Sequence, residues 1–256
     1  RQFLGIYRKK TTKRKGEELM KFNQSLQVAR EESFDIERPE VSVIGISSQV
    51  TVVESQDGKC RVRILAASKK ALKTAGLAEI VQVDRKLTVR IDKKSWSINT
   101  TLPLDKKDQN FWGINFGPLR GLSVEIALPE SASLKIKTVA GDLEVNQAVS
   151  ELEIGSVSGD VTIGKNPTED CTIKTVSGDI ATHTYSACNY TLKSVSGDIK
   201  VYVAPDLNVE VDGNSISGDL NSEIPLHGDE EASGNSDKVV KISTSTISGD
   251  FNLVRV

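Results

Sequence analysis

Apolar and polar residues alternate in the second half of the chain around a repeated Ser-Gly-Asp motif, such as SVSGDI at residues 194–199. Counted from the Gly of each copy, positions −7, −5, −2, +2 and +4 are mostly apolar. This alternation predicts two short strands, each with one buried face, that meet at a corner where only Gly tolerates the backbone conformation. The five apolar columns, position −2 included, are the predicted buried faces.

The motif occurs six times at nearly regular intervals. Its glycines follow one another after 18, 19, 19, 21 and 31 residues: Gly141, Gly159, Gly178, Gly197, Gly218 and Gly249. About 19 residues at ~3.3 Å each give a path of roughly 60 Å, which is one circuit of a narrow coil. Equivalent residues would then stack about 4.8 Å apart. The sequence therefore predicts an all-β fold, a single-stranded parallel β-helix, and the absence of a hexapeptide pattern favours its right-handed form.

The regular array spans residues 128–256, and degenerate first coils are predicted in residues 33–127. Apolar and polar residues alternate there within 33–55, 59–64 and 86–91. Coils of this kind are stabilised by their neighbours, so the two ends of the array need caps.

Three further segments interrupt or flank the coils. Residues 68–76 predict a short helix near the N-terminal end, with a Ser cap and a terminal Gly, that would lie over the open end of the coil. Residues 225–237 are acidic and rich in Gly and Ser, which predicts an ejected loop. Residues 1–32 contain the basic run RKKTTKRK and predict a basic tail or a frayed segment.

The run LPESASLKIKTVAGDLEV at residues 128–145, followed by SVSGDVTI, TVSGDIAT and SVSGDIKV, resembles the bacterial putative-adhesin family of β-strand repeat proteins, formerly a domain of unknown function. The resemblance runs from Leu128 to Val256 and extends back to Ser33. It implies a β-helix-like repeat domain without an established enzymatic activity. Some relatives resemble components of envelope-stress signalling, which implies a regulatory alternative. The first repeat departs from the motif, because Ala140 stands where the others have Ser.

The Asp of each motif would lie in a row of like charges. The six carboxylates are those of Asp142, Asp160, Asp179, Asp198, Asp219 and Asp250. Such a row persists if each carboxylate accepts hydrogen bonds at its corner, as in an Asx turn, or if cations bind between coils. The motif offers fewer ligands than the nonapeptide of calcium-binding β-rolls. Each Gly-Asp pair is therefore predicted to be a structural turn, with no metal site and no cofactor.

Catalysis is not predicted, because the acids recur in every coil whereas an active site needs groups that converge once. The histidines, His183 and His227, have no nucleophile or acid at a recognisable spacing. The cysteines, Cys60, Cys171 and Cys188, lack a CxxC pair and are predicted to be reduced thiols, with a Cys171–Cys188 disulfide as the alternative.

Two groups of residues are candidates for a partner surface. One is an outward basic column at position −4, for which a solvated face is the default interpretation. The other is the aromatic segment NFWGINFG at residues 110–117, for which a plug packed onto the coil is favoured over a binding loop. The residues are Lys137, Lys174 and Lys193 in the column and Phe111, Trp112 and Phe116 in the segment. The basic column suits an acidic glycan or the acidic edge of a protein.

The net charge of −2 does not favour a nucleic-acid partner, and no stretch of about 18 apolar residues could span a membrane. Cytoplasmic localisation is favoured from the visible chain. Because the chain begins at Arg1 and its only methionine is Met20, a missing upstream segment and association with the envelope remain the alternative.

The predicted function is a non-enzymatic scaffold or adhesin-like binding protein that presents repeated surfaces to a protein or glycan. One alternative is a sensory module of bacterial envelope stress. Another is a structural protein that polymerises end to end, since FNLVRV follows the last repeat without an evident cap.

Overall fold

The computed structural model describes residues 26–91, 121–224 and 239–256. Ten strands form a first sheet, here called sheet A. In spatial order they are β1 (Gln27–Phe34), β4 (Cys60–Ala66), β7 (Leu122–Leu128), β3 (Gln49–Glu54), β9 (Leu143–Val145), β11 (Val161–Ile163), β13 (Ile180–Thr184), β15 (Ile199–Val203), β19 (Phe251–Arg255) and β17 (Leu220–Ser222).

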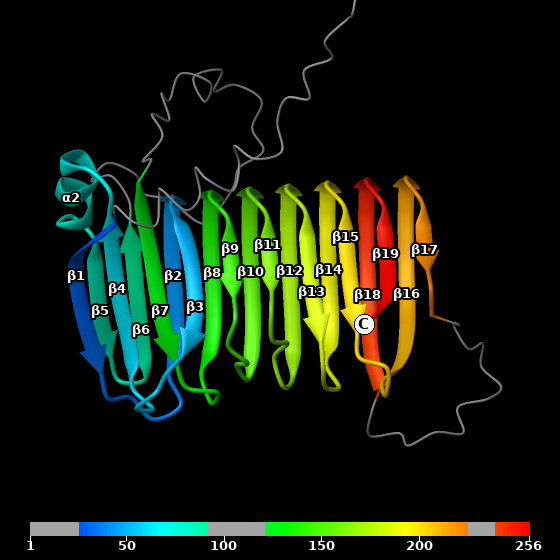
Figure 1. The fold of residues 1–256 in the computed structure, drawn as a ribbon, viewed down its shortest axis with the longest axis horizontal. Coiled ribbons are helices and arrows are strands. Elements are labelled where there is room, and N and C mark those ends of the chain that lie inside the picture. Colours follow the sequence, from blue (N-terminus) through cyan, green and yellow to red (C-terminus); the bar gives the residue numbers. More distant parts are fainter. Residues whose placement is uncertain (1–25, 92–120, 225–238) are drawn as a thin grey trace, which may run out of the picture.

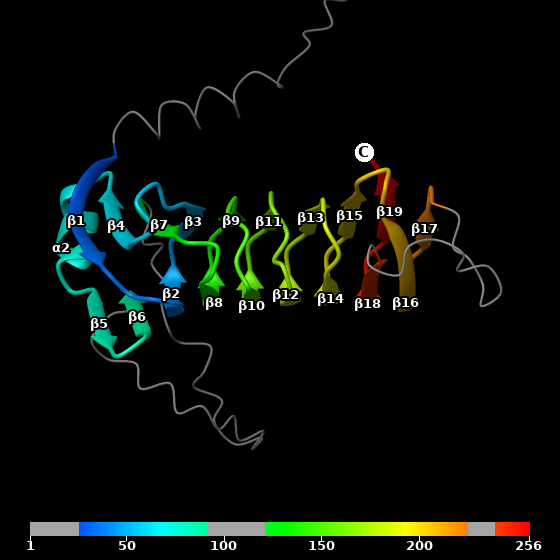
Figure 2. The ribbon, with the colours of Figure 1, turned by 90° about the horizontal axis from the view of Figure 1, so that it is seen from below.

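Nine strands form sheet B, which lies against sheet A as a second layer (Figure 2). In spatial order they are β16 (Asn208–Ser217), β18 (Val239–Ser248), β14 (Asn189–Ser196), β12 (Asp170–Ser177), β10 (Glu151–Ser158), β8 (Ser133–Ala140), β2 (Glu40–Ser47), β6 (Lys86–Ile91) and β5 (Glu79–Val83). From β8 onward the chain alternates between the sheets, so each coil consists of one strand of sheet B followed by one of sheet A.

Equivalent residues of the coils stack in register, as the repeat predicts. Leu152 of β10 pairs with Leu134 of β8 and with Cys171 of β12, and Ile154 pairs with Ile136 and Ile173 in the same two strands. The ladders of the regular coils are parallel. The fold is therefore all-β with mostly parallel strands and one short helix among the described residues, while the right-handed winding stays a prediction.

The core lies between the two sheets. The columns at positions −7, −5, +2 and +4 point inward, and Leu152, Ile154, Val161 and Ile163 of one coil are all at most 2% exposed. Burial of such stacked aliphatic columns is the main stabilising contribution, at about 25 cal/mol per Å² of apolar surface. Cys171 occupies position −7 and is fully buried, and all three cysteines are free thiols.

The prediction that position −2 is buried is wrong. Positions −7, −5 and −3 share one face of the sheet B strand, so the residue at −2 lies on the opposite, outer face. The inward position −3 holds hydroxyl side chains instead, in the column Thr138, Ser156, Thr175, Ser194, Thr246 and Ser215. The aliphatic residues at −2 are therefore available at the surface.

The coils do not follow one another in sequence order at the C-terminal end. Strand β18 lies between β14 and β16, and β19 lies between β15 and β17 (Figure 1). The last repeat in the sequence is thus inserted between the two repeats that precede it. A single uninterrupted winding was expected, and this part of the prediction is wrong.

The N-terminal end is less regular than the array. Strand β4 runs antiparallel to both β1 and β7, and β5 runs antiparallel to β6. The helix α2 (Lys69–Ala75) contacts β4 and β1 and buries Ala71 and Ala75. Figure 1 shows α2 at the very end of the stack.

The helix confirms the predicted caps. The Ser68 hydroxyl accepts a hydrogen bond from the Ala71 N–H at 3.1 Å, and the Gly76 N–H donates to the Leu72 carbonyl at 3.1 Å. These bonds satisfy backbone groups that a helix end leaves unpaired. No helix among the described residues is long and apolar enough to cross a membrane. The predicted loop 225–237, the aromatic segment 110–117 and most of the tail 1–32 lie outside the described residues.

Candidate interaction surfaces

The glycines of the motif lie in a file at one corner of the stack. A β-carbon built on Gly178 would lie 2.2 Å from the Gly159 carbonyl oxygen, and one built on Gly159 would lie 2.4 Å from the Gly141 oxygen. The file then runs from Gly197 to Gly249 and from there to Gly218, which reproduces the inserted order of the coils. The corner is thus a close approach of backbone to backbone.

The Asp column lies beside this file and is bonded from coil to coil. The Asp160 N–H donates to Asp142 Oδ1 at 3.1 Å, and the Asp179 N–H donates to Asp160 Oδ1 at 3.0 Å. The same bond links Asp198 to Asp179, Asp250 to Asp198, and Asp219 to Asp250. Each carboxylate except that of Asp219, in the last coil, therefore stabilises the next coil, whereas Asx geometry would have placed the bond within its own turn.

The described residues contain no cluster of three or more His, Cys, Asp or Glu side chains that could hold a metal ion. The Asp column spreads its charges along the stack axis, one carboxylate in each coil. A cation would need several oxygen ligands converging on one point. The row is a repeated hydrogen-bond acceptor.

The predicted basic column is brought together on the outer face of sheet B. Lys174 pairs in register with Lys193 on β14, and Gly155 of β10 separates Lys174 from Lys137 of β8. All three lysines are exposed. The column is therefore a short basic stripe with one gap, at the position that the repeat predicts.

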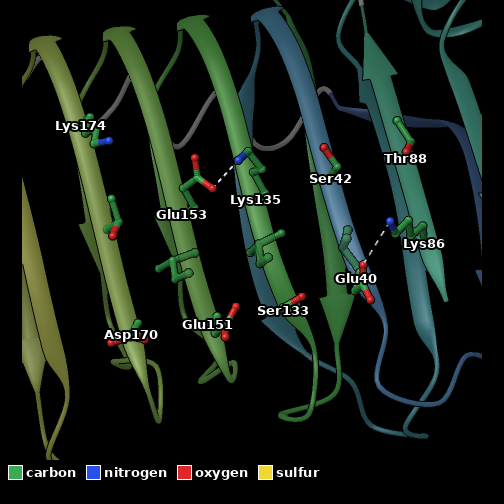
Figure 3. Close-up of a pocket in the computed structure, with 14 residues that line it drawn as sticks. Glu40, Ser42, Lys86, Thr88, Ser133, Lys135, Glu151, Glu153, Asp170 and Lys174 are labelled. Atoms are coloured by element: carbon green, nitrogen blue, oxygen red, sulfur yellow. Dashed lines mark hydrogen bonds and ion pairs between the residues drawn. The ribbon is translucent and has the colours of Figure 1, made fainter.

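An open depression of about 590 Å³ lies on the same face, over β6, β2, β8, β10 and β12 (Figure 3). Its floor carries charged side chains, most of which are paired with a side chain of opposite charge. Lys135 forms an ion pair with Glu153, and Glu40 lies 2.8 Å from Arg85 and 3.8 Å from Lys86. The lining contains no His and no Cys. Its polar side chains project from neighbouring strands over the depression and do not converge on a single reacting atom.

The thiols are poor nucleophiles. Burial raises the pKa of Cys60 to about 11 and that of Cys188 to about 12, and burial raises the pKa of Cys171 well above its usual range. Because the thiolate is the reactive form, none of the three sulfur atoms is activated at neutral pH.

The surface that the sequence analysis missed is an exposed aliphatic stripe at position −2. Its members, in spatial order and with their exposed fractions, are Val157 (48%), Val176 (47%), Val195 (42%), Ile247 (48%) and Ile216 (77%). The stripe runs between the Lys column at position −4 and the Asp column at +1. The odd-numbered spacing between −7 and −2 was the signal that could have placed these residues outside.

Comparisons with known proteins identify the fold. A model of the Toastrack DUF4097 family matches residues 40–187 and also residues 123–254. A search of the curated proteins found no match. Two similar solved structures are a putative cell adhesion protein from Clostridium sporogenes and a putative adhesin from Bacteroides fragilis.

The first structure is 12% identical, with a TM-score of 0.50, and the match covers 89% of this chain and 99% of that one. The second is also 12% identical, with a TM-score of 0.46, and covers 89% and 97%. At this identity the first likeness bears on the fold alone.

Proposed function

Since the chain belongs to the Toastrack DUF4097 family, we propose that it is a non-enzymatic binding module whose aliphatic stripe docks a protein partner. The stripe is the five-residue column Val157, Val176, Val195, Ile247 and Ile216. It is the observation that carries the proposal, because soluble proteins seldom expose a continuous row of aliphatic side chains without a binding role.

The stripe is long and rigid enough to bind a protein segment. Four intervals of about 4.8 Å make a row roughly 19 Å long. Each member is fixed by a strand whose inward face is buried, so binding costs little ordering of the surface. The three exposed valines and the two isoleucines would release water from apolar surface when a partner covers them.

Charges on both sides of the stripe would orient the partner. Lys174 and Lys193 lie on one side, and Asp179 and Asp198 lie on the other. Charged rims of this kind increase association rates and select partners more than they add affinity. A partner surface with an apolar ridge between an acidic and a basic row would match this pattern.

A protein fits the stripe better than a glycan does. Sugar hydroxyls covered by aliphatic side chains would lose hydrogen bonds to water without gaining new ones, which costs free energy. The polar depression over β8 and β10 is the part of the described surface where a glycan could form hydrogen bonds. The two surfaces can therefore be tested separately.

The non-enzymatic assignment rests on the repetition of the polar groups. The Asp residues share one role in successive coils, and the thiols of Cys60 and Cys188 are held protonated by burial. Catalysis by a general acid and base needs two groups with different environments at one point. The adhesin-like descriptions of similar structures agree with a binding role but leave the partner open.

The test is site-specific photo-crosslinking in the native host. A photoreactive side chain at Val176 or Val195 is expected to capture the same protein, whereas one at Thr162, which is exposed on β11 in sheet A, is expected not to. The Val176→Asp/Val195→Asp variant should lose the partner and keep its melting temperature, because both valines are already exposed. Equal capture at Thr162, or undiminished binding by the double variant, would refute the proposal.

A further inference from the structure

The stack ends differently at its two extremities (Figure 1). At one end, β16 and β17 form the last coil. At the other, β1 and β5 are the last strands of the two sheets, and α2 contacts β4 and β1. The end formed by β16 and β17 is here called the acidic end, and the end formed by α2, β1 and β5 the basic end, for the charges given below.

The core is cut open at the acidic end. Leu220 occupies position +2, where Val161, Ile180 and Ile199 are at most 1% exposed, yet Leu220 is 49% exposed. Val211, at the buried position −7, is also only partly buried. Among the described strands, the interior of this coil has a neighbour on one side only, and Gly213 and Ser222 stand at two of its inward positions.

The backbone is open at the same end. Strand β16 pairs with β18 and β17 pairs with β19, and neither has a second partner strand among the described residues. Native edge strands are commonly protected by Lys, by Pro or by a bulge. The sequence of β16, NVEVDGNSIS, contains neither Lys nor Pro, and its only charged residues are the acids Glu210 and Asp212. A ten-residue edge is thus left able to pair with another strand.

The charge of this coil is uniformly negative. Residues 205–224 contain no Lys or Arg, and their acids are Asp206, Glu210, Asp212, Asp219 and Glu223. Glu210 lies 3.7 Å from Lys241 of the neighbouring strand. Asp212 and Glu223 form no ion pair with any residue that the structure describes. Two acidic ends would therefore repel each other.

The basic end takes its positive charge from α2 and has apolar surface of its own. The acids of β1 and β5 are paired with arginines: Glu32 with Arg30, Glu31 with Arg61 and Glu79 with Arg90. Residues 68–77 contain Lys69, Lys70 and Lys73 and no acid, and no ion pair joins these lysines to the described residues. Apolar side chains are exposed beside them on α2, on the turn that follows and on β5. They are Leu72 (38%), Leu77 (51%), Val81 (50%) and Val83 (61%).

We propose that the acidic end of one molecule binds the basic end of the next. The open coil would cover its apolar interior with α2 and β5 of the neighbour, and the two sets of opposite charges would set the orientation. A head-to-tail contact that uses two different surfaces forms an open filament unless its rotation closes a ring. Because the two surfaces lie at opposite ends of the stack, the contact adds molecules along the stack axis and produces a filament. The aliphatic stripe stays exposed in such a filament, so this inference does not depend on the proposed function.

The first experiment measures the mass of the purified chain by sedimentation velocity and its shape by negative-stain electron microscopy. Rods that lengthen with protein concentration are expected at low salt. Their mean length should fall at 1 M salt, where the screening length is about 3 Å compared with about 30 Å at 0.01 M. A particle that stays monomeric at every concentration overturns the proposal.

A charge exchange tests the two surfaces directly. The Asp212→Lys/Glu223→Lys variant carries basic groups at both ends, and the Lys69→Glu/Lys73→Glu variant carries acidic groups at both. Each alone is expected to stay monomeric, and an equimolar mixture is expected to form rods, since every contact in an alternating filament again joins opposite charges. The four residues lie at the surface, so the fold should be retained.

The matched control is Lys165→Glu/Lys200→Glu, which changes two exposed lysines away from both ends of the stack. It is expected to form rods like the unchanged chain. Loss of rods in this control with rods kept in the end variants would place the contact on the side of the stack and refute the proposal. Rods formed by either end variant alone would refute it as well.

Discussion

Gly178 occupies a position in the file of corner glycines where a side chain has no room. Its φ of +153° is one that side chains rarely adopt, and a β-carbon would lie 2.2 Å from one backbone oxygen of the preceding coil. The corner alone predicts that this position requires Gly. The structure adds the close approach between coils, which makes the requirement stricter than a turn by itself would.

We expect Gly178→Ala to lower the free energy of unfolding by at least ~1 kcal/mol, because the backbone of two coils must separate to admit the methyl group. The matched control is Gly155→Ala, since a β-carbon at Gly155 meets no atom within 4 Å. Urea denaturation monitored by circular dichroism measures both. Similar unfolding midpoints for the two variants would contradict the close approach at the corner.

The buried thiols predict a dependence of stability on alkaline pH. Their pKa in the unfolded chain is near the usual 9.0, whereas burial raises the pKa of Cys60 to about 11 and that of Cys188 to about 12. The unfolded state therefore loses these protons first as the pH rises. The contribution of the protonated thiols to the free energy of unfolding is complete below pH 9 and is lost between pH 9 and 12.

Urea denaturation at pH 8 and pH 10.5 measures this loss. The Cys60→Ala/Cys188→Ala variant is the control, because Lys and Tyr side chains titrate in the same range and affect both chains. We expect the variant to lose less stability than the unchanged chain over this interval. An equal loss in the two chains would mean that the thiols do not contribute.

At the scale of secondary-structure elements, the inserted coil is the feature that sequence order did not reveal. Any two repeats could pair in register, because all present the same columns at the same positions. The 31-residue interval between Gly218 and Gly249 was interpreted as a loop ejected from consecutive coils. In the structure, β16 and β17 do not pair with β14 and β15, which precede them in the sequence. Strands β18 and β19 lie between the two coils and pair with both.

Engineered disulfides test this order of strands. Lys193 of β14 pairs with Ser245 of β18, and Ser245 pairs with Asn214 of β16. We expect the Lys193→Cys/Ser245→Cys variant to form a disulfide on mild oxidation, since neighbouring strands are about 4.8 Å apart. The Lys193→Cys/Asn214→Cys variant should remain reduced, since two strand spacings of nearly 10 Å exceed the limit for a disulfide.

Mass spectrometry of the intact proteins and of their peptides distinguishes the two results. The native cysteines are buried and serve as an internal reference for unreacted thiols. A disulfide between positions 193 and 214, with none between 193 and 245, would restore the sequential order of coils.

For the whole molecule, the consequence of stacking is that stability depends on position along the axis. Ile199 and Leu220 occupy the same column, but Ile199 is fully buried by coils on both sides, whereas Leu220 is 49% exposed in the last coil. The same truncation should therefore lower the free energy of unfolding more in the middle of the stack than at the acidic end.

We expect Ile199→Ala to cost about 2–5 kcal/mol, because it leaves a cavity in a closed core. Leu220→Ala should cost about 1 kcal/mol or less, because half of the side chain is already in water. The comparison is made at low protein concentration and high salt, so that contacts between molecules do not contribute. Equal costs would mean that the end of the stack is covered.

The sequence by itself determined the repeat, the Gly corner, the inward columns, the short helix with its Ser68 cap and the row formed by Lys137, Lys174 and Lys193. All of these follow from local geometry or from the rule that equivalent residues stack. The outward direction of Val176 and its equivalents was also encoded in the sequence, in their odd-numbered spacing from position −7. Tertiary structure decided two things: the inter-coil bonds of the Asp column and the order of the last two coils. Because every repeat presents the same columns, any two coils could stack on each other. Sequence periodicity therefore does not determine which coil lies beside which. The long-range pairing of strands selects one order and thereby determines which coil lies at the end of the stack.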